Sequence, residues 1–449
     1  MTYPVTSQKL PWWRIGLYSL ASAGLNILAI TVSTWLIYFY APPADSGRVQ
    51  YLPAALLGVV GFLVGIWDAV IDPFIGHYSD NLRSKFGRRK PFLFIFAPVT
   101  AILAVLLWTP PADAGVPLTL AYFLLIVLAY NTAYSLVGIP YDATMPEMAP
   151  DAKQRVGLSY WKNVFGIIGV LIGSLVAAPL FGTIGAVAMG AVVGGVALIT
   201  IWGALFGMKE TPKPVGDQMT AVEGIKTTLK NKQFLSVFFS TLLVHITYAM
   251  IQADLPYFIT LIVGGTEGDV GIFLGIMIII MAVTGPLWLL FNKKTPQRTL
   301  QRIAMIGLAV SVGLLFFVGQ IPGVPVDIQA YVILALVGFF LGGYLIVIYA
   351  MMGNVVDYDE MLTGRRREAN YYGTFSLGVG LGSSVGILVL PQLLEIFGYT
   401  RANPLGVRIA FLVMVVFILV GYALFQGYKL GETPEETRKN MNLPEVTHE

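Results

Sequence analysis

The sequence of 449 residues has no cysteine, only three histidines and few charged residues, which make up 12% of the chain. Without cysteine, neither disulfides nor thiolate metal sites can form, so stability has to come from helix packing. Hydrophobic residues make up 56% of the chain and the mean hydropathy is +0.74, whereas about a quarter of the residues of an average soluble domain are charged. The sequence therefore predicts a protein whose main solvent is a lipid bilayer.

The motifs of common membrane enzymes are also lacking. There is no His-Glu-x-x-His metal motif, no phosphate-binding Gly-x-x-x-x-Gly-Lys loop and no loop long enough to hold a soluble domain. These absences argue against an acyl or glycosyl transferase, and we expect the protein not to be an enzyme. Residues 1–10 carry one lysine and no small-residue cleavage pattern, so we expect no cleaved signal peptide.

Twelve apolar runs are long enough to cross a bilayer, which takes about 20 residues. The predicted spans are 13–40, 53–77, 92–110, 117–141, 159–181, 184–208, 233–262, 268–292, 299–320, 327–353, 372–398 and 404–428. The polar segment 209–232 carries five lysines and divides the spans six and six. We therefore expect an N-terminal six-helix bundle over 1–208, a cytoplasmic linker over 209–232, and a C-terminal six-helix bundle with a short cytoplasmic tail over 233–449.

The 28 basic residues are distributed unequally about these spans. Arg48, Arg401 and Arg408 fall on one side, Lys162 falls within a span, and all the others fall on the other side. Because lysine and arginine are enriched in cytoplasmic loops, the side that carries most of them is expected to be cytoplasmic. An even number of spans then places both termini in the cytoplasm, with the protein in the inner membrane of the cell.

Two carboxylates lie within the second predicted span. At 100° per residue, Asp68 and Asp72 share a sector of about 80° with three glycines. A charged side chain in the middle of the membrane costs at least about 2.5 to 3.5 kcal/mol, and two carboxylates one helical turn apart repel each other. Such a pair requires a cation, either a shared proton or Na⁺, unless basic neighbours neutralise each acid separately. The pair is our candidate cation site.

Three spans carry polar or small residues at spacings of three and four, which place them on one helix face. These stripes are Ser19, Ser22, Asn26 and Ser33; Asn131, Ser135, Gly138 and Asp142; and Thr241, His245, Tyr248 and Gln252. Such faces normally look inward, either for helix packing or to line a solute path. Our candidate solute-binding residues are Asn26, Tyr141, Asp142, Lys162, His245, Tyr248 and Gln252.

The positions of three charged residues leave alternatives open. Lys162 shares a face with glycines and points inward, or it extends to the cytoplasmic interface. Asp142 pairs with Lys162 across two helices, or it is the first residue of a loop. Asp254 lies opposite the polar stripe of its span and two residues before Pro256, which indicates a helix break or a bundle contact.

Several segments resemble a known transporter family. Gly76-His-Tyr-Ser-Asp80, followed by Gly87-Arg-Arg-Lys-Pro91, is similar to the loop signature of the major facilitator superfamily. The run Trp67-Asp-Ala-Val-Ile-Asp-Pro-Phe-Ile-Gly76 resembles the glycoside-pentoside-hexuronide cation symporters, the melibiose permease-like family, as do segments 139–155 and 356–368. The resemblance implies an all-α integral membrane protein with the major facilitator fold, in which 12 transmembrane helices form two six-helix bundles. It also implies alternating access and a cation site at Asp68 and Asp72.

Charged residues in the loops at the cytoplasmic side form a candidate gate. They are Asp80, Arg88, Arg89, Glu147, Arg155, Asp357, Glu360, Arg366 and Glu368. Ion pairs between the bundles would hold the outward-open state and break as the halves rock. The alternative is that these charges only solvate the loops and set the topology.

The chain departs from the family at several solute-contacting positions. Gly380 stands where the family has a lysine that contributes to coupling, Gly138 and Asn26 replace aspartates, Asp142 replaces a tryptophan and Lys162 an arginine. These changes leave room for two alternatives on the same fold, a transporter of an amphipathic lipid such as a lysophospholipid and an uncoupled sugar facilitator.

Our leading interpretation is secondary active symport of a sugar or glycoside coupled to H⁺ or Na⁺. A channel is the less favoured possibility, because intramembrane acids and gate charges in both halves favour alternating access. We expect a monomer surrounded by membrane lipid that binds a small, sugar-like solute, with no cofactor or metal apart from the coupling ion, and no nucleic acid.

Overall fold

The computed structural model describes residues 10–111, 114–149, 152–210, 221–365 and 367–441, which contain helices and no strand. The long helices are α1 (Trp12–Tyr40), α2 (Ala54–Asn81), α3 (Lys90–Leu106), α4 (Gly115–Met148), α5 (Ala152–Thr183), α6 (Ala186–Gly207), α8 (Lys232–Tyr257), α9 (Val270–Val283), α11 (Gln297–Leu315), α12 (Val326–Thr363), α13 (Glu368–Phe397) and α14 (Leu405–Phe425). Shorter elements are α7 (Ala221–Thr228), α10 (Gly285–Asn292), α15 (Pro434–Met441), η1 (Ala44–Ser46), η2 (Phe258–Val263) and η3 (Glu267–Asp269).

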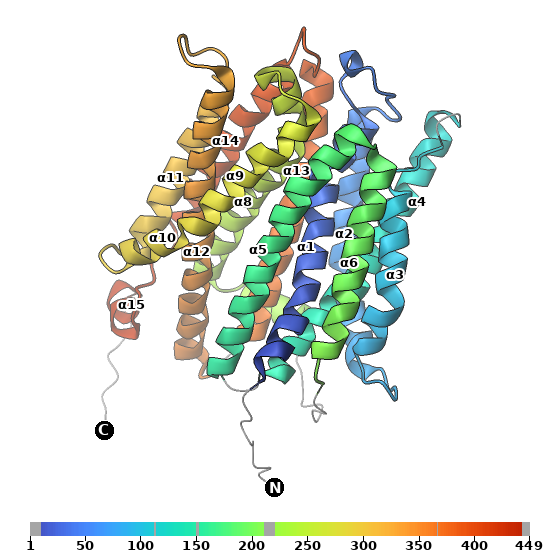
Figure 1. The fold of residues 1–449 in the computed structure, drawn as a ribbon. Coiled ribbons are helices and arrows are strands. Elements are labelled where there is room, and N and C mark those ends of the chain that lie inside the picture. Colours follow the sequence, from blue (N-terminus) through green and yellow to red (C-terminus); the bar gives the residue numbers. More distant parts are fainter. Residues whose placement is uncertain (1–9, 112–113, 150–151, 211–220, 366, 442–449) are drawn as a thin grey trace, which may run out of the picture.

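The twelve predicted spans all correspond to helices. In the described chain, 11 helical segments are long and apolar enough to cross a membrane, and α3, with 17 residues, is a shorter apolar helix. Helices α1 to α6 pack on one another and form an N-terminal set, while α8 to α14 form a C-terminal set (Figure 1). The expected all-helical membrane fold is confirmed.

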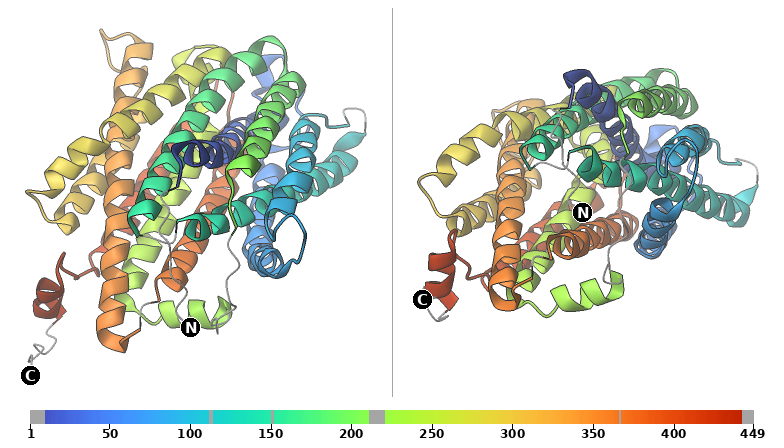
Figure 2. Two further views of the ribbon diagram at one scale, coloured as in Figure 1. Left: turned by 60° about the horizontal axis from the view of Figure 1, so that its bottom comes forward. Right: turned by 90° about the horizontal axis from the view of Figure 1, so that it is seen from below.

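The two ends of the bundle have different connections. The end that carries the start of α1, together with α7 and α15, is called the lower face, and the end that carries η1 and η3 is called the upper face. Helices α7 and α15 lie beside the ends of the long helices at the lower face (Figure 2). The two sets meet chiefly through three helix pairs, α2 with α13, α5 with α9, and α1 with α8.

Two helices continue beyond their predicted ends. Helix α4 has 34 residues and α12 has 38, which at 1.5 Å per residue correspond to about 51 and 57 Å, well over the roughly 30 Å of a bilayer core. Asp142 therefore lies on α4. The prediction that the gate residues lie in loops was wrong for six of them, which lie on helices: Asp80, Glu147, Arg155, Asp357, Glu360 and Glu368. Hydropathy marks the bilayer rather than the end of a helix, and α4 contains Pro140 and Pro146 without ending there.

Two predicted spans are interrupted instead. The span 268–292 divides into η3, α9 and α10, with Thr284 ending α9 and Pro286 at the start of α10. Helix α8 contains Pro256 and passes at Phe258 into the π-helical turn η2. Proline removes a backbone donor and its ring clashes with the preceding turn, which explains why the regular helix is disturbed at both places.

Small residues allow the two sets to meet closely at the upper face. A Cβ atom on Gly58 of α2 would lie 2.8 Å from the carbonyl oxygen of Leu388 on α13, and one on Gly65 would lie 1.7 Å from the Oγ of Ser384. Further down α13, a Cβ on Gly380 would have no other atom within 4 Å. The contact between α2 and α13 is therefore tight over its upper part and gives way to open space below.

Candidate functional site

The candidate cation site lies in α2 just below this contact. Asp68 and Asp72 are both partly buried, one turn apart on the same helix, and the two carboxylates interact electrostatically. One oxygen of each, Oδ1, is buried and has no hydrogen-bond partner within the described part of the chain. Two adjacent acids with unsatisfied buried oxygens can hold a proton or take part in coordinating a small hard cation.

Helix α4 supplies the polar surroundings of this pair. The hydroxyl of Ser135 interacts with Asp72, and the indole Nε1 of Trp67 donates to Thr132 Oγ1 at 2.9 Å. Ser135 belongs to the predicted polar stripe of its helix, and it adds a third oxygen close to the acids. Among the described residues no group of three or more acidic or histidine side chains could hold a metal ion, so a metal at Asp68 and Asp72 would depend on such hydroxyl oxygens or on water.

Lys162 of α5 and Asp142 of α4 form an ion pair. Their Nζ and Oδ1 atoms are 2.6 Å apart, with the side chain of Asp142 62% exposed and that of Lys162 22% exposed. The Lys162 Nζ also lies 5.5 Å from the ring centre of Tyr141. One turn before Asp142, a Cβ on Gly138 would meet no atom within 4 Å. Of the alternatives left open by the sequence, the structure shows the pair, beside open space.

The other candidate solute residues differ in accessibility. Asn26 is partly exposed and donates from Nδ2 to the carbonyl oxygen of Ser22 at 2.8 Å. Tyr141 is buried against Tyr18, and each hydroxyl donates to the other residue's carbonyl oxygen, at 2.9 and 3.1 Å. Tyr141 thus joins α1 to α4 in this conformation and, at 1% exposure, offers almost no surface to a solute.

The stripe on α8 is largely covered. His245 and Gln252 are buried, whereas Tyr248 is partly exposed. The Nδ1 of His245 lies 2.9 Å from the carbonyl oxygen of Thr241, one turn earlier. Thr241 Oγ1 in turn accepts from the hydroxyl of Tyr344 on α12 at 3.2 Å. Tyr248 is therefore the member of this stripe with the most surface available to a solute.

At the lower face, two of the predicted gate residues, Arg88 and Arg89, converge on a third, Glu147. Glu147 Oε1 lies 2.5 Å from Arg88 Nη2 and 2.8 Å from Arg89 Nη1, and Arg89 Nη2 lies 2.5 Å from Asp80 Oδ1. Arg89 is buried, and its Nη1 also donates to the carbonyl oxygen of Ala143. This network ties α2, α3 and α4 together within the N-terminal set.

Glu210, which the sequence did not single out, completes the network. Its carboxylate accepts from the backbone N–H groups of Arg88, Arg89 and Lys90 at 2.5, 3.1 and 2.9 Å, at the start of α3. An acid at a helix N-terminus satisfies free donors and the helix dipole. Gly87 makes room for it, with φ at +105°.

The C-terminal set has an ion pair of its own at the lower face. Arg367 donates from Nε and Nη2 to the two oxygens of Asp359 at 2.9 and 2.7 Å, so the pair is bidentate. Neither residue was among the predicted gate residues. Arg366 lies outside the described residues, while Arg155, Asp357 and Glu368 lie exposed at the lower face. Where both partners are described, each ion pair at this face joins residues of one set.

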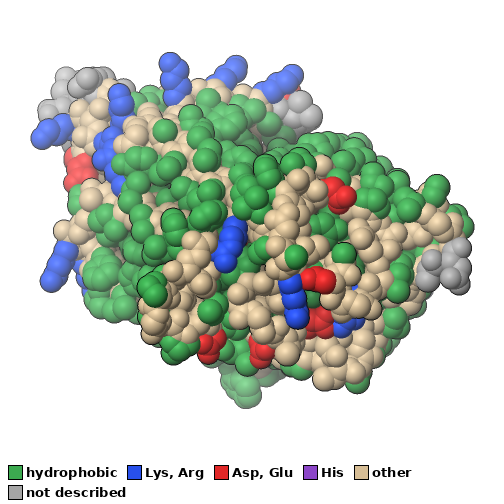
Figure 3. Space-filling view, turned by 90° about the horizontal axis from the view of Figure 1, so that it is seen from above, with side chains coloured by type: hydrophobic (Ala, Val, Ile, Leu, Met, Phe, Trp, Pro, Cys, Tyr) green, Lys and Arg blue, Asp and Glu red, His purple; other side chains and the backbone are tan. Residues whose placement is uncertain are grey.

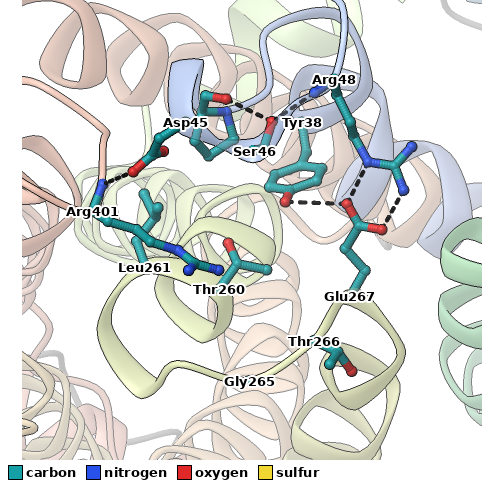
Figure 4. A pocket seen from close by; sticks show the side chains of 11 residues that line it. Tyr38, Asp45, Ser46, Arg48, Thr260, Leu261, Gly265, Thr266, Glu267 and Arg401 are labelled. Atoms are coloured by element: carbon teal, nitrogen blue, oxygen red, sulfur yellow. Dashed lines mark hydrogen bonds and ion pairs between the residues drawn. The ribbon is translucent and has the colours of Figure 1, made fainter.

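A contact missed by the sequence analysis joins the two sets at the upper face. Arg48, in the segment between α1 and α2, donates from Nε to Glu267 Oε1 at 2.6 Å and from Nη2 to Oε2. Tyr38 donates to the same carboxylate at 3.3 Å, and the Arg48 guanidinium lies 4.7 Å from the ring centre of Phe181. Figure 4 shows Arg48 and Tyr38 converging on Glu267. We call Arg48, Glu267 and Tyr38 the upper latch.

The latch lines a pocket of about 300 Å³ to which both sets contribute, with Asp45 and Arg401 on its other side (Figure 4). Figure 3 shows that this face is mostly hydrophobic and uncharged, with few charged side chains over its middle. Other contacts between the sets lie nearby: Tyr257 to the oxygen of Ala41 at 2.7 Å, Gln392 to that of Ala55 at 2.8 Å, and Ala54 N to Glu395 Oε2 at 3.1 Å.

Comparisons with known proteins agree with this architecture. The family described as MFS/sugar transport protein matches residues 17–432. The symporter YnaJ of Bacillus subtilis (strain 168) is 28% identical over 442 residues, which cover 90% of this chain and 88% of YnaJ. The isoprimeverose transporter of Lactiplantibacillus pentosus is 26% identical over 406 residues, covering 86% and 81%.

Among solved structures, the nucleoside transporter NupG has a TM-score of 0.69 at 17% identity, covering 92% of this chain and 99% of NupG, which shows a shared fold. The resemblance to the glycoside-pentoside-hexuronide cation symporters is confirmed by the family match and by these relatives. Since the family and the curated relatives consist of transporters, the protein is a multi-pass membrane transporter and not an enzyme. The chain belongs to the MFS/sugar transport protein family.

Proposed function

We propose that the protein is a symporter that couples uptake of a sugar or glycoside to H⁺ or Na⁺ at Asp68 and Asp72. The observation that carries the proposal is the pair of adjacent, partly buried carboxylates in α2, each with an unsatisfied buried oxygen. Helix α2 also makes the tight upper contact with α13. A cation that neutralises the pair would therefore act on the helix that joins the two sets.

The orientation of the protein in the membrane follows from the distribution of its lysines and arginines. Most lysines and arginines lie on the side of the lower face, so the positive-inside rule makes it cytoplasmic, with both termini there and the protein in the inner membrane. The upper latch then closes the outer side in this conformation. We expect the lower-face acids and arginines to make pairs between residues 1–208 and 233–449 in the outward-open state, so that they act as the cytoplasmic gate.

The sugar-like solute is supported by the chemistry of the candidate solute residues that keep some exposed surface. Asn26, Tyr248 and the Lys162–Asp142 pair offer amide, hydroxyl, ammonium and carboxylate groups, which suit sugar hydroxyls. The relative named an isoprimeverose transporter points to the same class of solute.

The proposal is tested by uptake into proteoliposomes that contain the purified protein. A panel of labelled mono- and disaccharides and one lysophospholipid would be offered with an imposed Na⁺ gradient, an imposed pH gradient, or neither. We expect one sugar to accumulate above its outside concentration only with one of the gradients, which also identifies the ion. Uptake of the lysolipid alone, or sugar uptake that only equilibrates under both gradients, would contradict it.

Replacing Lys162 by methionine should weaken solute binding. It leaves Asp142 without its ion-pair partner and removes a charged hydrogen-bond donor, worth about 1.5 to 3 kcal/mol, so the half-saturating solute concentration should rise about ten-fold or more. The measurement is the concentration dependence of solute counterflow. Lys293→Met, an exposed lysine at the lower face, is the matched control, and an unchanged half-saturating concentration in Lys162→Met would show that the pair does not contact the solute.

A further inference from the structure

One buried acid is used neither by the candidate cation site nor by the latch. Asp254 of α8 has no solvent exposure, and neither of its carboxylate oxygens has a hydrogen-bond partner among the described residues. An isolated ionised carboxylate in a protein interior costs several kcal/mol even after the surroundings relax. The neutral acid is therefore the form that this site accommodates.

The residues that share a face of α8 with Asp254 pack against α14. Seven residues earlier on the same face, Thr247 donates to the carbonyl oxygen of Met414 on α14 at 3.3 Å. One turn later, the ring of Phe258 lies 5.3 Å from that of Phe411, also on α14. Asp254 thus faces the interior of the C-terminal set, on the opposite side of α8 from the polar stripe.

Charged and titratable groups on the elements around α8 are engaged elsewhere. Those nearest the upper end of α8 are Tyr38 of α1, Glu267 of η3, Tyr344 of α12, Glu395 of α13, Tyr399 after α13 and Arg408 of α14. Arg408, for example, donates to the carbonyl oxygens of Phe316 and Val318. Among the described residues, none forms a hydrogen bond with either carboxylate oxygen of Asp254, and the phenol of Tyr257, three residues further along the chain, interacts with it electrostatically.

Tyr257 connects this acid to the contact between the sets. Its hydroxyl donates to the carbonyl oxygen of Ala41 across the junction, and its ring lies 4.9 Å from that of Tyr38, a member of the upper latch. Pro256 lies between Asp254 and the π-helical turn η2, and the helix is irregular at this point. The Tyr257 contact with Ala41 thus belongs to the closed upper face, and it lies where α8 is least regular.

We infer that Asp254 is a proton-binding site which must be occupied for the upper face to close. In the closed conformation the carboxyl is buried without a partner and holds its proton. In the open conformation it meets water and releases the proton to that side. Closure therefore takes up one proton at Asp254 and opening releases one, so a lower pH at the upper face favours the closed conformation. This site is separate from Asp68 and Asp72 and does not depend on the identity of the solute.

The absence of cysteine allows a direct test by single-cysteine labelling. Thr34 is buried on α1, one turn from Tyr38 on the same face, so Thr34→Cys should react with a membrane-impermeant maleimide only when the upper face is open. Val49→Cys is the reference, because Val49 is 61% exposed, and the ratio of the two labelling rates cancels the pH dependence of the thiol itself. The variants would be labelled in right-side-out vesicles between about pH 8 and about pH 6.

As the pH is lowered, the ratio of Thr34→Cys to Val49→Cys labelling is expected to fall. The fall is at most about ten-fold for each pH unit, which is the limit for one linked proton. Asp254→Asn, which mimics the neutral acid, should give a low ratio that does not change with pH, and Asp254→Leu serves if the Asn variant does not reach the membrane. The variant Asp68→Asn/Asp72→Asn should keep the pH response, which separates this site from the coupling site. A pH-independent ratio with Asp254 intact, or an unchanged pH response in Asp254→Asn or Asp254→Leu, would overturn the inference.

Discussion

Asp68→Asn and Asp72→Asn should each abolish accumulation of the solute while leaving exchange across the membrane. One cation moved per solute at 100 mV supplies about 2.3 kcal/mol, which corresponds to accumulation of up to about 50-fold, since 1.4 kcal/mol is a factor of ten. An amide neither binds a proton nor neutralises a cation, so the inside-to-outside ratio should fall to about one. The measurement is gradient-driven uptake compared with solute counterflow in the same proteoliposomes.

The matched control for these variants is Asp327→Asn. Asp327 is exposed in the first turn of α12 and lies far along the chain from the candidate site, so the same chemical change there should leave accumulation intact. If Asp68→Asn and Asp72→Asn both accumulate the solute as the unmodified protein does, the two carboxylates are structural and coupling occurs elsewhere.

Breaking the upper latch should shift the protein toward the conformation that is open at the upper face. The Arg48–Glu267 pair is bidentate, and the Glu267 side chain is only 16% exposed, so we assign it about 1 to 2 kcal/mol, between the values for exposed and buried pairs. Arg48→Ala should therefore raise the ratio of open to closed molecules about five- to thirty-fold. Labelling of Thr34→Cys from the upper side would report this shift.

A charge reversal distinguishes the ion pair from a general loss of packing. Arg48→Glu alone places two acids together and should open the upper face further than Arg48→Ala, whereas Arg48→Glu combined with Glu267→Arg should restore part of the closed population. Arg401→Ala is the matched control, because the described contact of Arg401 with the N-terminal set is made by its backbone N–H to Asp45 Oδ2. Equal labelling in the single and double reversals would show that the pair does not stabilise the closed conformation.

Much of this architecture follows from local sequence patterns. Hydropathy located all twelve spans, because apolar length is a property of each segment alone. Helical periodicity placed Asp68 and Asp72 on one face, and the structure leaves both carboxylates partly unsatisfied there. Their role in cation binding stays a prediction, as do the roles of the solute and gate residues.

Other features depend on tertiary contacts that no local pattern encodes. Arg48 and Glu267 are separated by 219 residues, and the sequence signal was only that each is a charged residue in an otherwise sparsely charged connecting segment. Glu210 caps α3 from the far end of α6, which only the packing of these helices determines. In the sequence, Tyr141 cannot be distinguished from an aromatic residue that faces the solute. In the structure, its hydroxyl donates to the carbonyl oxygen of Tyr18 and its ring stacks on the ring of Tyr18.

The pocket at the upper latch has a pharmacological consequence. Its walls come from both sets of helices, so its shape exists only while those sets are in contact at that face. A small molecule that fills the roughly 300 Å³ space would bind this conformation more tightly than the opposite one, and a ligand shifts an equilibrium by its difference in affinity for the two states. Such a molecule would inhibit transport without competing for the solute site, by holding the carrier at one step of its cycle.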